Sequence, residues 1–138
     1  MTATISREMV ADLMTIDPVV VADDAPIEEA ERLMRTYRVS GLPVINAHGT
    51  LVGVISQTDF IHLDSPDVRS LIRGAGSGFR VGEVMSRPPL TVPMTSGLTD
   101  AARLMVTEKV HRLVVVDDHQ RPRGVLSAID YVSMAAEG

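Results

Sequence analysis

The sequence predicts an α+β protein built from two β-α-β-β-α repeats that pack through their sheets about a pseudo-twofold axis. The first observation is internal repetition. When 71 is subtracted from each residue number, residues 81–130 superpose on residues 10–59 without a gap, and 17 of these 50 pairs are identical. The second observation is size, since a unit of about 50–60 residues with an aliphatic core is marginally stable alone. Pairing of the halves would stabilise both and form clefts of the kind in which ligands bind.

The elements of the first repeat follow from apolar periodicity and from turn residues. Pro26 stands near a first helical position, Ser40-Gly41 breaks the helix that follows, and residues 46–49 form a turn between two strands. The predicted elements are, in order, a helix over 7–14, a strand over 18–21, a helix over 27–37, strands over 42–45 and 51–55, and a helix from Thr58 to about Leu63. The second repeat is predicted to have the same order.

The amino-acid composition changes between the two repeats. Residues 64–80 are rich in Pro, Ser, Gly and charge, and Gly74–Gly78 is the loosest part. We therefore expect three regions: a first repeat with its N-terminal helix over 1–65, a linker over 66–80, and a second repeat over 81–138.

The composition argues against several classes of function. A net charge of −5 gives no overall attraction for nucleic acid or an anionic membrane, and 3% aromatic residues cannot build a base-stacking surface. The absence of cysteine excludes disulfides, thiolate nucleophiles and cysteine-based zinc sites. The N-terminus lacks the apolar core of a signal peptide, and no apolar run approaches the roughly 20 residues of a membrane span. We therefore expect a cytoplasmic protein.

One stretch occurs in both repeats and carries chemical groups. Gly53–Asp59 and Gly124–Asp130 each read as a buried strand that ends in a hydroxyl, with a carboxylate three residues later at a helix start. These groups, together with unpaired backbone N–H groups of the first helical turn, suit a ribose or a phosphate. Alternatively, Ser56 or Thr58 caps the helix and Asp59 favours its first turn, a stabilisation of about 1 kcal/mol. Both interpretations are open from the sequence alone.

Matching residues in both copies resemble a known family. They are Asp12–Thr15 with Pro18, Val39–Val44 and Gly53–Asp59 in the first copy, and Glu83–Ser86 with Pro89, Val110–Asp117 and Gly124–Asp130 in the second. The repeat resembles the CBS domain, and the pair resembles a Bateman module that covers nearly the whole chain. The resemblance implies a regulatory module that binds AMP, ADP, ATP or S-adenosylmethionine in clefts between the repeats. It also implies a homodimer, since such modules often form a flat disc of four repeats.

The resemblance further implies which residues bind the ligand, because each cleft of the family takes its walls from different repeats. Cleft one would combine Thr91, Val110, His111 and Arg112 with Ser56, Thr58 and Asp59. Cleft two would combine Val20, Val39, Ser40 and Gly41 with Ser127, Ile129 and Asp130. In each, the acid would accept bonds from both ribose hydroxyls, the hydroxyl side chains would bond ribose or phosphate, and apolar neighbours would hold adenine.

The two clefts are not expected to be equal. His111 and Arg112 give cleft one a cationic side, so we expect it to take the nucleotide phosphate. Cleft two is expected to bind weakly, to bind a less charged adenosyl ligand, or to stay empty. In the alternative interpretation, Arg112 pairs with Asp117 or Asp118 at the surface and His111 is an edge histidine with its bonds satisfied.

Other polar and sulfur side chains have simpler explanations than a site. His48 and His119 stand at equivalent turn positions, which turn polarity explains better than metal binding, so no metal site is predicted. The methionines at 14, 34, 85 and 105 lie on apolar stripes and are expected in the core rather than as cofactor ligands.

Three classes of function compete. A ligand-sensing regulatory module without catalysis or cofactor is the preferred hypothesis. An enzyme is not expected, because the sequence contains no G-x-S-x-G, Walker lysine or H-E-x-x-H motif. A scaffold whose clefts are vestigial and whose faces bind another protein is the alternative. The sequence shows no effector domain, so we expect a sensor that acts on a separate regulated protein or is a piece of a larger system.

Overall fold

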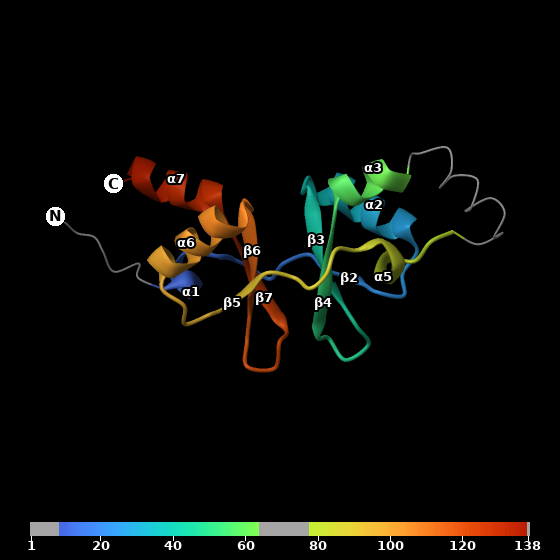
Figure 1. Ribbon diagram of the computed structural model, residues 1–138, viewed down its shortest axis with the longest axis horizontal. Helices are drawn as coiled ribbons and strands as arrows, with labels where there is room; N and C mark the ends of the chain where they lie inside the picture. Colours follow the sequence, from blue (N-terminus) through green and yellow to red (C-terminus); the bar gives the residue numbers. More distant parts are fainter. Residues whose placement is uncertain (1–8, 64–77, 138) are drawn as a thin grey trace. The chain divides into compact units, whose positions relative to one another are not determined.

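The computed structural model describes residues 9–63 and 78–137, and the chain divides into two compact units. The central unit comprises residues 19–89, and the terminal unit comprises residues 1–18 together with 90–138. Each unit contains one sheet with helices beside it, as Figure 1 shows. The predicted α+β class is therefore confirmed. The predicted packing of one sheet on the other concerns the units together, and it stays a prediction.

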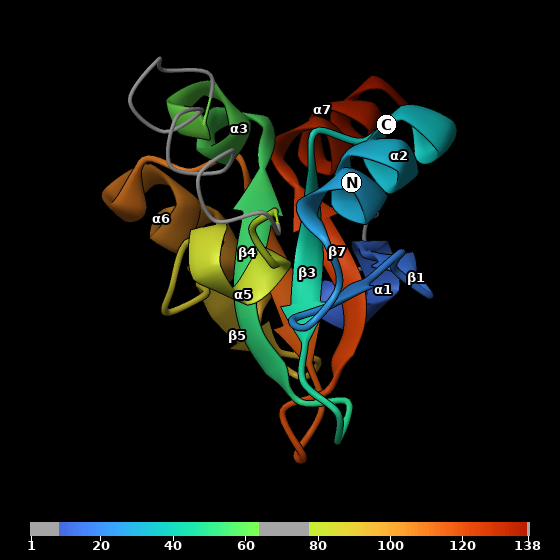
Figure 2. The same cartoon turned by 90° about the vertical axis from the view of Figure 1, so that its right-hand side faces the viewer.

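The central unit is built on a three-stranded sheet in the order β2-β3-β4. Strand β2 (Val21–Ala22) runs parallel to β3 (Gly41–Ile45), and β3 pairs antiparallel with β4 (Leu51–Ser56), the pair seen side by side in Figure 2. Among its described residues, the helices are α2 (Ile27–Tyr37), α3 (Gln57–Leu63) and α5 (Val81–Val84). The buried core of this unit consists of Val21, Ala25, Ala30, Met34, Leu42, Val44, Ile55 and Val81.

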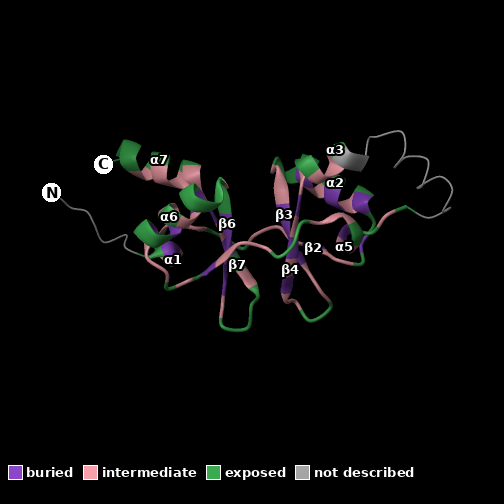
Figure 3. Ribbon diagram, in the orientation of Figure 1, coloured by how far each residue is buried: buried purple, intermediate pink, exposed green. Residues whose placement is uncertain are grey.

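The terminal unit has a four-stranded sheet in the order β1-β7-β6-β5. Its strands are β1 (Thr15–Ile16), β5 (Thr91–Pro93), β6 (Arg112–Val116) and β7 (Pro122–Ser127), and its helices are α1 (Val10–Leu13), α6 (Leu98–Glu108) and α7 (Ala128–Glu137). The helices lie on one side of the sheet in Figure 1, and buried residues gather where helices face strands in Figure 3. The buried core consists of Val10, Val92, Leu98, Ala101, Met105, Leu113, Val115 and Leu126.

The boundaries of some elements differ from the predictions. The strand predicted over 18–21 is limited to Val21–Ala22, and the two-residue strand β1 was not predicted. Helix α2 ends at Tyr37 because Arg38 adopts a left-handed conformation with φ of 55° and closes the helix with its N–H on the carbonyl of Met34. Tyr37 is 55% exposed and lies outside the buried stripe. Of the predicted linker over 66–80, residues 66–77 lie outside the described residues.

The compact units do not coincide with the repeats along the sequence, because the repeats exchange their first segments. Strand β1 of the first repeat pairs with β7, where Thr15 faces Val125 and Ile16 faces Gly124. Reciprocally, Ser86 of the second repeat exchanges two backbone hydrogen bonds of 3.0 and 2.8 Å with Val54 of β4. Each core therefore includes a residue from the other repeat.

Two glycines at equivalent positions allow the exchanged segments to approach the last strand closely. A Cβ on Gly53 would stand 2.5 Å from Sδ of Met85 and 2.9 Å from the carbonyl oxygen of Ser86. A Cβ on Gly124 would stand 2.5 Å from Sδ of Met14 and 2.8 Å from the carbonyl oxygen of Thr15. Backbone and sulfur occupy the place that any larger residue needs. Glycine is therefore required at both positions for close backbone approach.

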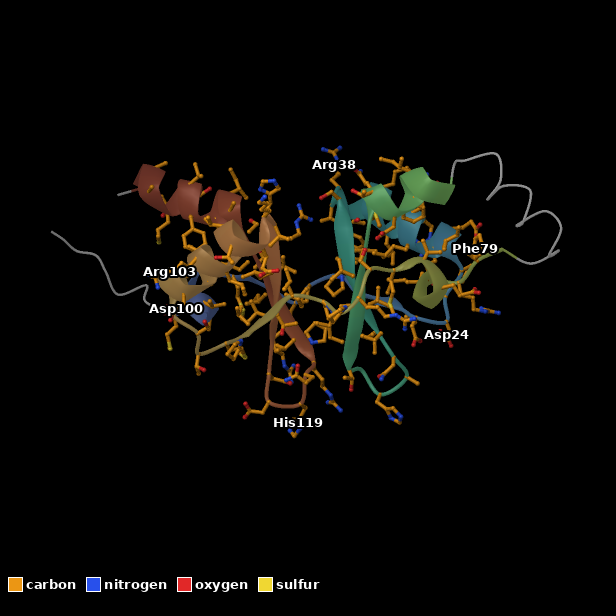
Figure 4. The ribbon with its side chains drawn as sticks, viewed as in Figure 1. Asp24, Arg38, Phe79, Asp100, Arg103 and His119 are labelled. Atoms are coloured by element: carbon orange, nitrogen blue, oxygen red, sulfur yellow. The ribbon has the colours of Figure 1, made fainter. Side chains whose placement is uncertain are left out.

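The hairpin turns are organised by one side chain each. The Oδ1 atom of Asn46 accepts the N–H groups of His48 and Thr50 at 2.9 and 3.1 Å. The Oδ1 atom of Asp117 accepts those of His119 and Arg121 at 2.9 and 3.0 Å. Figure 4 places His119 at the tip of its hairpin, pointing away from the unit. The described residues contain no group of three His, Asp or Glu side chains that could hold a metal ion.

Asp117 differs from Asn46 by its charge. Its Oδ2 atom also accepts a bond of 2.7 Å from Nε of Arg123. The pKa of Asp117 is lowered to about 2, first by the N–H of Arg121 and then by Arg123 and the N–H of His119, against an opposing effect of desolvation. The ionised carboxylate is therefore favoured in the folded state.

We predict that Gly124→Ala lowers the free energy of unfolding by about 1–3 kcal/mol, because the methyl group must displace the backbone of Thr15 or the side chain of Met14. Urea denaturation measures the change. Gly78→Ala is the matched control, since its Cβ would meet only the carboxylate of Glu28, at 3.6 Å, and should change the free energy by less than about 0.5 kcal/mol. Equal effects of the two substitutions would contradict the proposed role of close packing.

We predict that Asp117→Asn makes the protein less sensitive to acid. Because the pKa of Asp117 is lower in the folded state, its contribution is fully present above the usual value of 3.8 and is lost as the pH falls toward about 2. The amide can still accept the turn's N–H groups, as Asn46 does. Thermal melts between pH 5 and about 2 should show a smaller decline for the variant than for the wild type. The exposed neighbour Asp118, changed to Asn, should leave the decline unaltered.

Candidate functional site

The predicted strand-end groups meet in both units. Strand β4 ends at Ser56, and Oδ2 of Asp59, in the first turn of α3, accepts the Ser56 N–H at 2.8 Å and the Ser56 hydroxyl at 3.3 Å. In the terminal unit, Oδ2 of Asp130 accepts the N–H and the hydroxyl of Ser127 at 2.7 and 3.0 Å. One oxygen of each acid thus accepts the serine N–H at the helix start, which is the acid's half of a capping box. The serine hydroxyls donate to the acids, and within the described residues no helix N–H is bonded to them, so the predicted cap by a hydroxyl is not observed.

The second oxygens of the two acids have different surroundings. Oδ1 of Asp59 accepts a 3.0 Å bond from the hydroxyl of Ser86. Within residues 9–63 and 78–137, Oδ1 of Asp130 has no hydrogen-bond partner. The residue equivalent to Ser86 in the first repeat is Thr15, and it makes no bond to Asp130. The sequence interpretation missed Ser86 as a site residue. The sequence feature that could have indicated Ser86 is a methionine followed by a hydroxyl residue, which occurs in both repeats as Met14-Thr15 and Met85-Ser86.

The residues that open the second long strand of each repeat lie beside the serine of the same repeat. In the central unit, Gly41 pairs with Ser56, and the carbonyl of Ser40 accepts the first N–H of α3 at 3.0 Å. In the terminal unit, Arg112 pairs with Ser127, and the carbonyl of His111 accepts the first N–H of α7 at 2.8 Å. The strand ends and helix starts are therefore tied together.

The remaining predicted site residues lie in or next to the strands and helices of their own repeat. Val39 and Val110 are half-buried, and their N–H groups bond the carbonyls of Met34 and Met105 at 3.0 Å. Thr91 is half-buried in β5 beside Val114, Val20 precedes β2, Thr58 is exposed, and Ile129 is 64% exposed. The structure thus brings the predicted residues of each repeat together within one unit. The predicted clefts combine residues of both units, and that combination stays a prediction.

Arg112 and His111 are exposed at the start of β6. The sequence left open that Arg112 pairs with Asp117, but the carboxylate of Asp117 is taken by Arg123. In the described part of the chain, Arg112 makes no ion pair with any acid. Its guanidinium group therefore remains available to an anion close to Ser127.

The Asp130 region has one more feature that the central unit lacks. The hydroxyl of Tyr131 donates a 2.6 Å bond to the carbonyl of Leu98. Burial, and to a lesser degree the charge of Asp130, raises the pKa of Tyr131. Phe60 stands at the equivalent position and has no hydroxyl, so the start of α7 is fastened to α6 by a bond that α3 cannot make.

Comparison with known proteins places the chain among similar sequences and folds. The family model described as CBS domain matches residues 10–65 and 81–137. The CBS domain-containing protein CBSX2, chloroplastic, of Arabidopsis thaliana is 34% identical over 139 residues, which cover 86% of this chain and 58% of the relative. The chain thus spans little more than half the length of this curated relative.

Solved structures share the fold. The crystal structure of CBSX2 in complex with AMP matches with a TM-score of 0.81 and 37% identity over 94% of this chain and 96% of that one. The CBS domain pair of protein MJ0100, in complex with 5'-methylthioadenosine and S-adenosyl-L-methionine, matches with a TM-score of 0.79 and 22% identity over the same shares of the two chains. The latter likeness concerns the fold alone.

Proposed function

Because the chain belongs to the CBS domain family and carries two copies of the domain, we propose that it is a regulatory module that binds an adenosine-containing ligand. The proposed ligands are AMP, ADP and ATP, with S-adenosylmethionine as a further candidate. The observation that carries the proposal is the strand-end group that occurs in both units, in which one aspartate oxygen accepts the N–H of the preceding serine and the second oxygen is not needed for that bond. The AMP complex of the similar protein CBSX2 supports this ligand class.

Each proposed contact follows from the chemistry of its side chain. A carboxylate accepts hydrogen bonds only, so Asp59 and Asp130 suit the two hydroxyls of a ribose. Arg112, which has no acid partner within the described residues, suits a phosphate oxygen, to which a charge-assisted bond contributes about 1.5–3 kcal/mol. The half-buried Val39 and Val110 suit the apolar face of adenine. The assignment of these residues to two unequal clefts, the first richer in positive charge, is part of the proposal.

The proposed module has no catalytic activity of its own. An acid that is bonded to a serine N–H and engaged by a ribose is not placed for proton transfer, and within the described residues no serine or threonine hydroxyl is bonded to a histidine base. The signal would therefore pass to a separate regulated protein or to another part of a larger system. A scaffold that binds a protein through its faces is the alternative function.

Assembly and location complete the proposal. A homodimer is supported by exposed apolar side chains on α3 and α7, namely Ile61, Ile129 and Val132, which are 67%, 64% and 59% exposed. Across the described residues, no helix combines the length and apolar character that crossing a membrane requires. The proposed compartment is the cytoplasm, with which a chain without cysteine is compatible.

We predict that AMP stabilises the protein and that Asp59→Asn and Asp130→Asn each weaken the effect. At about 100 times its dissociation constant, a ligand should add about 2.7 kcal/mol to the free energy of unfolding, visible as a thermal shift. Asparagine keeps an oxygen for the serine N–H but loses the charge that holds the ribose, so we expect about tenfold weaker binding at the altered site by calorimetry. If neither AMP, ATP nor S-adenosylmethionine shifts the melting of the wild type, the scaffold alternative replaces this proposal.

We predict that Arg112→Ala weakens AMP and ATP about tenfold or more and leaves adenosine nearly unchanged, since only the phosphate bond is removed. Arg103→Ala is the control, because Arg103 is an exposed residue of α6 that pairs with Asp100, as seen in Figure 4. Calorimetric titration also counts the sites. Two sites of equal affinity per chain would contradict the proposed inequality of the clefts.

A further inference from the structure

We infer that Ser86 is a specificity-determining residue that weakens the recognition of a ribose diol by Asp59. The inference rests on the proposed function. We call Ser56, Asp59 and Ser86 the Asp59 site, and Ser127 with Asp130 the Asp130 site. All members of each site belong to one unit.

The two sites differ in how many acceptor positions are free. A carboxylate offers about four lone-pair positions on two oxygens. In the Asp59 site, Oδ2 receives the N–H and hydroxyl of Ser56, and Oδ1 receives the hydroxyl of Ser86 at 3.0 Å. Three of the four positions are thus used. In the Asp130 site, only the two bonds from Ser127 are present in the described residues, so that Oδ1 keeps both of its positions.

The place of Ser86 is fixed by its backbone. Its N–H and C=O both bond Val54, the strand residue two positions before Ser56. The hydroxyl is therefore held near Asp59 whether or not a ligand is present, although the Ser86 residue itself is exposed. Thr15 occupies the equivalent place beside β7, pairing with Val125, and within the described residues Oδ1 of Asp130 has no hydrogen-bond partner. A single hydroxyl thus distinguishes two otherwise similar acids.

The consequence concerns the sugar. A ribose presents two neighbouring hydroxyls, and to bond both, Asp59 must release Ser86, whereas a sugar with one hydroxyl needs only the remaining position. The Asp59 site should therefore discriminate weakly between ribose and 2'-deoxyribose. The Asp130 site, with two open positions on one oxygen, should discriminate more strongly.

The test uses proteins in which one site keeps its carboxylate. Asp130→Asn retains the Asp59 site, and Asp59→Asn retains the Asp130 site. Each is titrated with AMP and with 2'-deoxy-AMP by calorimetry, before and after a second substitution, Ser86→Ala in the first and Thr15→Ala in the second. Ser86→Ala keeps both backbone bonds to Val54, and an unchanged melting temperature without ligand verifies the fold.

We expect Ser86→Ala to tighten AMP by about threefold to tenfold, the worth of one hydrogen bond to a carboxylate at an exposed position. The gain for 2'-deoxy-AMP should be smaller, so that the preference for ribose rises. Thr15→Ala should change neither ligand. Unchanged or weaker AMP binding by Ser86→Ala overturns the inference while the proposed function stands. Failure of AMP, ATP and S-adenosylmethionine alike to bind the wild type overturns both.

Discussion

The close approach of backbone at Gly53 and Gly124 is the constraint on which the rest of the structure depends. At each glycine, the first segment of the other repeat lies where a side chain would otherwise be. This contact adds β1 to the terminal sheet and bridges Ser86 to β4 in the central unit. It also carries Val10 or Val81, both fully buried, into the core of the unit. A single repeat therefore lacks part of its own core. Both repeats are needed for either sheet to have its full set of contacts.

The strand-end acids have a structural role that is compatible with the recognition proposed for them. One oxygen of Asp59 or Asp130 satisfies the serine N–H at the helix start, where water or another acceptor would otherwise be needed. The bond at the helix start and the proposed ribose contact are therefore compatible, because the first uses Oδ2 and the second is proposed for Oδ1. It follows that removing the whole carboxylate disturbs the helix start as well, which is why an amide substitution separates the two roles better than alanine.

Much of the fold could be predicted because the helices and hairpins follow from the local spacing of apolar residues and from turn residues. The stripe Ile27, Ala30 and Met34 is buried on α2, and the hairpin around Asn46 lies where turn residues indicated it. The exchange of segments could not be predicted, since Thr15 meets Val125 across more than a hundred residues and either repeat offers the same strand pattern to it. The serines and acids of the site were found from their spacing. Ser86 was missed because it reaches Asp59 only through the exchange.

The differences between the repeats are few, and they fall on the chemistry rather than on the fold. Arg112 pairs with Ser127 where Gly41 pairs with Ser56. The terminal unit therefore holds both this positive charge and Oδ1 of Asp130, which has no hydrogen-bond partner in the part of the chain that the structure describes. Ser86 meets its acid and Thr15 does not. Position 41 or 112 pairs with the strand-end serine in both units, so we expect a change of side chain there to alter the proposed recognition without altering the strand pairing. In the proposed function, duplication thus gives two candidate sites on one fold, whose affinities for phosphate and for sugar can vary independently.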